Sequence, residues 1–330
     1  MSIGTYGLQN TGLGLGQGEE SRSSKNATWQ RTLKWYRSTP EFIPSGLILI
    51  MVTCSLVWNH FGRISCSPNL FLLLATPALL LTFSVVYSIG RSGTKISEIA
   101  FYLALAQIYA IFSIRISYLS VAAGYPLMDT TLNNLDAALG FRWLQWADFI
   151  KNYHLFVWIQ QVAYDSFVWQ PIFIVPVLAV WRPRWQNAEV MTAMLIAIML
   201  TLFVATFVPA VGPADTLGLG PQPTANIIRI LRATPGAQDL PYLGIVSFPS
   251  FHAAMAVLYV YAYHGLRWVF RVALAFNILM LISTSYIGDH YLIDIVAGLA
   301  VATFAIAVAR YLVPVGTAGT PSGVAHKRSG

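Results

Sequence analysis

The chain has 330 residues, of which 56% are hydrophobic and only 10% are charged. Soluble domains carry about 25% charged residues, so this composition excludes an ordinary soluble protein and indicates one that crosses a membrane several times. The net charge of +7 does not indicate nucleic-acid binding, because excess Lys and Arg in a membrane protein most often mark cytoplasmic loops. We therefore expect no nucleic-acid partner.

Hydropathy along the chain predicts an all-α integral membrane protein with about eight transmembrane helices. A transmembrane helix needs about 20 predominantly apolar residues, and segments near this length recur from residue 43 onward. In chain order the expected spans are 43–59, 69–90, 98–122, 154–180, 189–211, 251–267, 269–288 and 291–313. A very short turn joins the sixth span to the seventh.

The distribution of basic residues predicts the orientation of these spans. Of the 20 Lys and Arg residues, 14 fall on the side of the N-terminus, five fall in the loops of the other side, and Arg115 lies within a span. Because basic residues concentrate on the cytoplasmic side, we expect both termini to be cytoplasmic. Two long loops, 123–153 and 212–250, then face the outside, and the first has the composition of an amphipathic helix lying on the surface.

Two histidine motifs carry the chemistry. The first, SFPSFHAA at 247–254, places His252 at the start of the sixth span. The second, at 283–299, places His290 and Asp294 four residues apart at the start of the eighth span. On a helix this spacing lets Asp294 hold one ring nitrogen of His290 and leaves the other free to attack. Two membrane crossings separate the motifs, so they return to the same, outer side of the membrane.

Three kinds of chemistry could use two histidines and an aspartate. They could bind a metal, but no HExxH motif and no cysteine pair accompanies them. They could form a proton relay, which would need more carboxylates along one path. In phosphoryl transfer, His290 would attack phosphorus, Asp294 would stabilise its imidazolium, and His252 would protonate the departing oxygen. This last interpretation uses all three residues, so we expect no metal and no cofactor.

These motifs resemble the second and third signatures of the type 2 phosphatidic acid phosphatase (PAP2) superfamily, which shares its core with vanadium haloperoxidases. The usual P-S-G-H is PSFH here, with Phe251 in place of glycine. The usual S-R-x5-H-x3-D is present except that Thr284 replaces the arginine. The first signature, K-x6-R-P, is absent, because Val175 stands seven residues before Arg182–Pro183, the only Arg-Pro pair.

These departures, together with LDAALGF, AYDSFVWQ and GDHYLIDIVAGL, look like the branch that includes inositol phosphorylceramide synthases. The resemblance covers about residues 125–313. It implies a six-helix catalytic core and a phosphohistidine on His290, with Asp294 as its partner and His252 as general acid. We expect four regions: a disordered or interfacial N-terminal tail (1–41, with an interfacial helix over 28–41), three additional transmembrane helices (42–122), a catalytic membrane domain (123–314) and a disordered C-terminal tail (315–330).

The resemblance does not supply the phosphate clamp, because the lysine and arginine that usually hold the phosphate in this family are missing. Arg229, Arg232 and Arg115 are the candidates for substrate binding, and each has an alternative role in binding lipid headgroups or pairing with another side chain. Ser250 either caps the sixth span or donates a hydrogen bond to phosphate. Asp289 is expected to cap the eighth span rather than take part in the chemistry.

The sequence therefore predicts a membrane lipid phosphatase or phosphotransferase that works at the outer face. Its substrate would be a lipid phosphate or a phospholipid headgroup, and its acceptor would be water or a lipid alcohol. Transfer to a lipid alcohol, as in inositol phosphorylceramide synthases, is the alternative within this class. The alternative of another class is a transporter that uses the histidines and aspartate as a relay, which would place ionisable groups at several depths.

Overall fold

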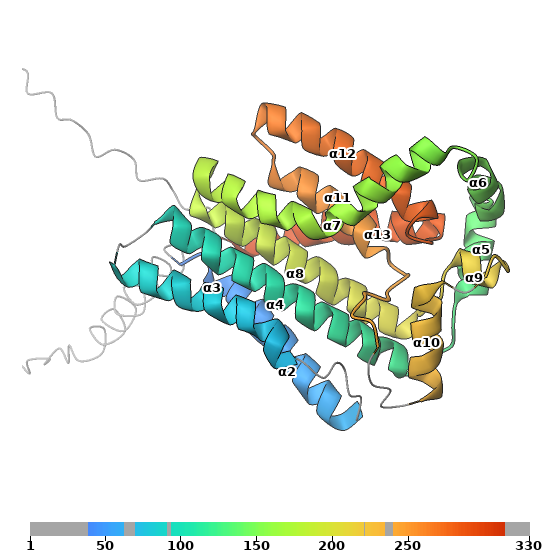
Figure 1. Ribbon diagram of the computed structural model, residues 1–330, viewed down its shortest axis with the longest axis horizontal. Helices are drawn as coiled ribbons and strands as arrows, with labels where there is room; N and C mark the ends of the chain where they lie inside the picture. Colours follow the sequence, from blue (N-terminus) through green and yellow to red (C-terminus); the bar gives the residue numbers. More distant parts are fainter. Residues whose placement is uncertain (1–38, 63–69, 91–93, 221, 235–239, 314–330) are drawn as a thin grey trace, which may run out of the picture. The chain divides into compact units, whose positions relative to one another are not determined.

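A computed structural model of the protein describes residues 39–62, 70–90, 94–220, 222–234 and 240–313 (Figure 1). Every regular element within these residues is a helix. The tails expected over 1–27 and 315–330 lie outside the described residues. The interfacial helix expected over 28–41 also lies outside them, except for residues 39–41.

Within the described residues, seven helices are long and apolar enough to cross a membrane, as in a multi-pass integral membrane protein. Each corresponds to a span expected from hydropathy. They are α2 (Phe42–Gly62), α3 (Leu70–Gly90), α4 (Lys95–Ala122), α7 (His154–Trp181), α8 (Arg184–Phe207), α12 (Arg267–Tyr286) and α13 (Leu292–Leu312).

The remaining expected span, 251–267, contains a shorter helix. Helix α11 (Phe251–Ala262) has 12 residues and is about 18 Å long, whereas the hydrocarbon core of a bilayer is about 30 Å thick. The helix ends early because the chain turns at Gly265, whose φ of +83° suits glycine. Helix α11 packs against α7, α8, α12 and α13, so its apolar residues are buried among other helices, and the rest of the expected span is the turn that leads to α12.

Short helices gather at one end of the bundle (Figure 1). The loop 123–153, expected as a single amphipathic helix, forms α5 (Asp129–Ala138) and α6 (Trp143–Ile150). They are separate because Gly140, with a φ of +81°, breaks the chain between them. The loop after α8 contributes α9 (Pro213–Thr216) and α10 (Pro223–Ala233). We call this end, where α11 and α13 begin, the histidine end.

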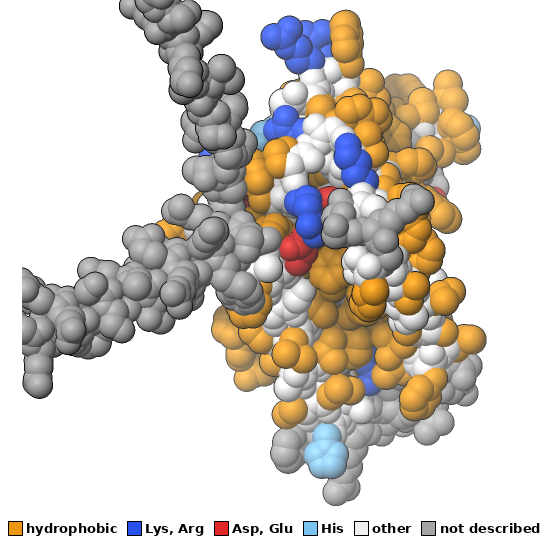
Figure 2. Space-filling model, turned by 90° about the vertical axis from the view of Figure 1, so that its left-hand side faces the viewer, with side chains coloured by type: hydrophobic (Ala, Val, Ile, Leu, Met, Phe, Trp, Pro, Cys, Tyr) orange, Lys and Arg blue, Asp and Glu red, His pale blue; other side chains and the backbone are white. Residues whose placement is uncertain are grey.

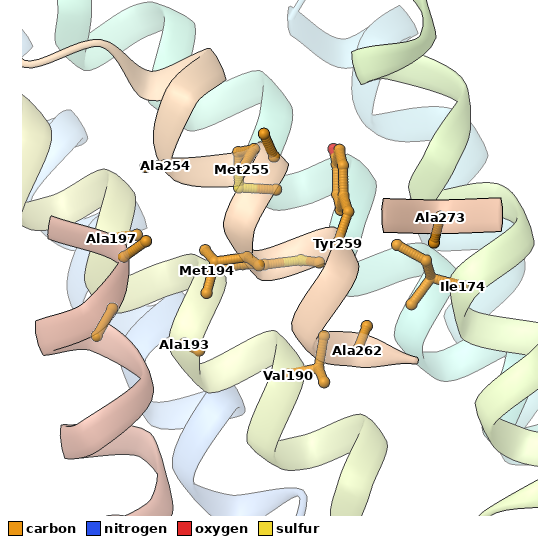
Figure 3. Close-up of a cluster of buried hydrophobic side chains, with 14 of the residues drawn as sticks. Ile174, Val190, Ala193, Met194, Ala197, Ala254, Met255, Tyr259, Ala262 and Ala273 are labelled. Carbon is orange, nitrogen blue, oxygen red and sulfur yellow. The ribbon is translucent and has the colours of Figure 1, made fainter. Parts of the chain in front are cut away.

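Small side chains allow the central helices to approach one another closely. Alanines from α8 and α11 form much of the buried core, and Met194 of α8 extends toward Tyr259 of α11 (Figure 3). The Tyr259 hydroxyl donates a 2.7 Å hydrogen bond to the main-chain oxygen of Phe167 in α7. This packing fixes α11 against α7, and α7 carries the side chains that cover His252.

The end of the bundle opposite the histidine end is rich in basic residues. Figure 2 faces this end and shows Lys and Arg side chains among hydrophobic ones. Arg184 pairs with Glu41 at 2.6 Å, and Asn187 donates a 2.7 Å hydrogen bond to the buried Glu98. The described basic residues at the ends of helices here are Lys95, Arg182, Arg184, Arg267, Arg271 and Arg310.

Candidate active site

The start of α11 lies directly on the first turns of α13. The Ser250 side chain caps α11 by accepting a 3.3 Å hydrogen bond from the amide of Ala253. The Ser250 amide donates to the main-chain oxygen of Asp294 at 2.9 Å. A Cβ on Gly298 would lie only 2.3 Å from the Ser250 carbonyl oxygen, so α13 needs glycine at this crossing. His252 is thereby brought beside the turn that carries Asp294.

His290 and Asp294 form a buried pair. Their Nδ1 and Oδ2 atoms are 3.3 Å apart, and both side chains are almost fully buried. The same Oδ2 accepts hydrogen bonds from the Ser247 hydroxyl at 3.2 Å and from the Tyr291 amide at 3.1 Å. These bonds hold the carboxylate in place. Because Nδ1 of His290 faces Asp294, Nε2 is the ring nitrogen left for a reacting group.

Two aromatic side chains of α7 cover His252. The imidazole stacks on Tyr164 with 4.1 Å between ring centroids and a 12° angle between planes, and it lies 4.2 Å from the ring of Phe167. A Cβ on Gly288 would lie 2.8 Å from the Tyr164 ring and 3.0 Å from Cδ2 of His290. The rings of Tyr164 and His290 therefore lie on either side of the Gly288 Cβ position. Tyr164 thus contacts His252 and also lies close to His290.

Asp136 of α5 caps α13 from another part of the chain. Its two carboxylate oxygens accept 2.8 Å hydrogen bonds from the amides of Leu292 and Ile293. Free amides at a helix start attract negative charge, so this buried carboxylate stabilises the first turn of α13. Burial raises the pKa of Asp136, and the two amide bonds oppose that shift.

Asp289 does not cap α13 as expected. Its backbone adopts a positive φ of 54°, which directs the side chain away from the helix start, and Oδ1 accepts a 2.8 Å hydrogen bond from the Ala214 amide in α9. A Cβ on Gly212 would lie 2.5 Å from Oδ2. Burial raises the pKa of Asp289 to about 6, against the opposing effects of the Ala214 amide and His290.

Asp129 of α5 connects the loop after α8 to the residues just before α13. Its carboxylate accepts hydrogen bonds from the amides of Val211 and Gly212 at 3.0–3.1 Å and from the Tyr291 hydroxyl at 3.2 Å. Asp129 and Asp136 could not be recognised from the sequence, because acidic residues in an amphipathic segment usually face water. Here both are buried, and they attach α5 to the loop after α8 and to the start of α13.

The arginines expected to bind substrate already have protein partners. One Arg229 nitrogen, Nη2, lies 2.6 Å from both carboxylate oxygens of Asp215, and Arg232 donates to the main-chain oxygen of Tyr125 at 2.6 Å. Both arginines belong to α10 at the histidine end. Arg115 is buried in α4. At 100° per residue, it lies on the side of α4 opposite Ser117 and Ser120, which line a small cavity with Ser247.

Neither Thr284, which replaces the arginine of the third PAP2 signature, nor Val175, which stands seven residues before Arg182, carries a charge. Thr284 is fully buried, and its hydroxyl donates a 2.8 Å hydrogen bond to the Met280 carbonyl within α12. Val175 is buried in an apolar cluster toward the other end of α7. Among the described residues, no group of three or more His, Cys, Asp or Glu side chains is placed to hold a metal ion.

Comparison with known proteins gives one match. A family model described as PAP2 superfamily matches residues 130–308, which is more than half of the chain and includes His252, His290 and Asp294. No curated protein and no solved structure matches.

Proposed function

The chain belongs to the PAP2 superfamily, and we propose from this that it transfers the phosphoryl group of a lipid phosphate by way of a phosphohistidine on His290. Membership by itself suggests phosphatase or phosphotransferase activity on lipid-like phosphates. The single observation that carries the finer proposal is the His290–Asp294 pair with His252 beside it.

In the first half-reaction, Nε2 of His290 attacks phosphorus. An N–P bond forms while the P–O bond to the lipid breaks, and protonated His252 gives its proton to the departing oxygen. Asp294 stabilises the positive charge that develops on the His290 ring, because its Oδ2 lies 3.3 Å from Nδ1. The lipid leaves as a neutral alcohol, and the phosphoryl group stays on His290.

In the second half-reaction, an acceptor hydroxyl attacks phosphorus and the N–P bond breaks. His252, now neutral, takes the proton of the acceptor and returns to its starting state. Water as the acceptor gives a phosphatase, and a lipid alcohol gives a transferase. The resemblance to inositol phosphorylceramide synthases supports a transferase of that type, with a phospholipid headgroup donor and a ceramide-like acceptor.

The test is turnover by purified protein in detergent with EDTA present. We expect phosphate release from phosphatidate, or transfer from a labelled phospholipid when ceramide is added. His290→Ala should lower kcat by at least about a thousandfold, and His252→Ala by about 10²–10⁴-fold. His154→Ala is the matched control, since His154 is an exposed histidine at the start of α7. Full turnover by His290→Ala would rule out the phosphohistidine, and loss of activity in EDTA would indicate a metal-dependent reaction.

A further inference from the structure

Gln160 of α7 is a buried amide without a hydrogen-bond partner. Its side chain is fully buried, and neither Nε2 nor Oε1 has a partner among the described residues. Two other glutamines of α7 differ in this respect. Gln161 donates to Asp165 at 3.0 Å, and Gln170 exchanges hydrogen bonds of 2.9 and 3.1 Å with Asn277.

An unpaired buried amide requires an explanation. Leaving a buried donor and acceptor without partners is costly, and folded proteins normally satisfy such groups with protein, water or a ligand. If this position served only for packing, leucine or methionine would fill a similar volume without the free-energy cost of burying unpaired polar atoms. Gln160 is therefore a candidate for contact with a polar molecule that enters the protein.

The position of Gln160 connects it with the two histidines. Residues four and seven apart lie on one face of a helix, so Gln160 shares a face of α7 with Tyr164 and Phe167. Those two rings cover His252, and Tyr164 also approaches the Gly288 position beside His290. Gln160 lies one turn nearer the start of α7, about 6 Å closer to the histidine end along the helix axis.

We propose that Gln160 binds the phosphoryl group of the substrate. An amide offers one donor side and one acceptor side, and a monoanionic phosphate monoester offers the complement: a P–O⁻ oxygen that accepts from Nε2 and a P–OH that donates to Oε1. The proposal rests on the proposed function, in which His290 receives that phosphoryl group. It supplies a polar contact to the phosphate in a chain that lacks the lysine and arginine of the family clamp.

The experiment measures phosphate binding separately from turnover. Inorganic phosphate is used as a competitive inhibitor of phosphatidate hydrolysis, and as a ligand that raises the melting temperature of the protein in detergent. The variants are Gln160→Leu, which removes both polar atoms, and Gln160→Glu, which adds a negative charge. Gln161→Leu on the neighbouring exposed position is the control.

We expect Gln160→Leu to raise the Ki of phosphate and the KM of phosphatidate by about tenfold to a hundredfold, as for loss of a hydrogen bond to a charged group. Gln160→Glu should weaken both further, and Gln161→Leu should change neither by more than about twofold. Gln160→Leu should fold normally, because leucine leaves no unpaired polar atom in the core.

The outcomes separate this inference from the proposed function. If wild-type protein is active and both Gln160 variants keep its Ki, the side chain holds only water or packing contacts, and the inference is wrong. If wild-type protein binds phosphate through Gln160 but shows no turnover that depends on His290, the inference stands and the proposed function does not. If wild-type protein neither binds phosphate nor turns over lipid phosphate, both are wrong.

Discussion

Asp289 illustrates how a single residue next to His290 can be constrained by its neighbours. Its positive φ is uncommon for a residue with a side chain, and its carboxylate is packed between the Ala214 amide and the Cα of Gly212. The contact with Gly212 leaves no room for another side chain there. Burial disfavours the charged form and outweighs the opposing effects of the Ala214 amide and His290, so the pKa of Asp289 rises to about 6.

This shift predicts a pH-dependent contribution to stability. The folded-state pKa lies above the ordinary value of 3.8, so the stabilisation that protonated Asp289 provides is complete below pH 3.8 and is lost as the pH rises through about 6. Asp289→Asn does not titrate. We therefore expect wild-type protein to lose melting temperature relative to Asp289→Asn between pH 4.5 and 7.

The measurement is a thermal-melting series in detergent at half-unit steps from pH 4.5 to 7.5. The exposed Asp165→Asn variant is the control, and its curve should run parallel to that of wild-type protein. A constant difference between wild-type protein and Asp289→Asn over the whole range would show that Asp289 ionises alike in the folded and unfolded chains.

At the scale of elements, the start of α13 is held by other parts of the fold. Its first turn carries Asp294, and its first two amides bond to Asp136 of α5, more than 150 positions away in the chain. The main-chain oxygen of Asp294 in the same turn accepts a hydrogen bond from the Ser250 amide, and Gly298 in the next turn lies against the Ser250 carbonyl. The geometry of the His290–Asp294 pair is thus held by α5 and α11 as well as by its own helix.

Removing this distant cap should affect both stability and turnover. We expect Asp136→Ala to cost about 1–2 kcal/mol, as for loss of a helix cap, and to lower kcat more than it changes KM, because His290 and Asp294 lose their alignment. Asp136→Asn keeps one acceptor oxygen and should fall between. Asp148→Ala, at an exposed carboxylate of α6 paired with Lys151, is the control in melting and kinetic assays. Equal effects of Asp136→Ala and Asp148→Ala would contradict the capping role.

The helices differ in how well the sequence predicted them. Long apolar runs predicted the seven long helices, because hydropathy within one segment is enough to indicate a span. The length of α11 was overestimated, since its apolar residues face other helices instead of lipid. The four-residue spacing predicted the contact of His290 with Asp294, but His290 lies two residues before α13 begins and not on the helix as expected. The roles of Tyr164 and Asp136 could not be predicted from the sequence. Each role depends on which helix packs against the residue, and the tertiary fold determines that.

At the scale of the whole described bundle, the two ends differ in charge and in structure. The histidine end holds the short helices, the three buried carboxylates of Asp129, Asp136 and Asp294, and the half-buried Asp289. The opposite end carries basic residues where α4, α8 and α12 begin and where α7 and α13 end (Figure 2). From the positive-inside rule we expect the opposite end to face the cytoplasm and the histidine end to face outside, where the proposed site would meet lipid of the outer leaflet.

This orientation can be tested by labelling single cysteines in intact cells. With Cys54 and Cys66 replaced by serine, Leu219→Cys adds an exposed thiol in the turn after α9, and Trp268→Cys adds one at the start of α12. We expect a membrane-impermeant maleimide to label position 219 in intact cells and position 268 only after permeabilisation, because the basic end resists translocation. The reverse pattern would place the histidines on the cytoplasmic side. The lipid phosphate would then have to come from the inner leaflet, while the chemistry assigned to His252, His290 and Asp294 would be unchanged.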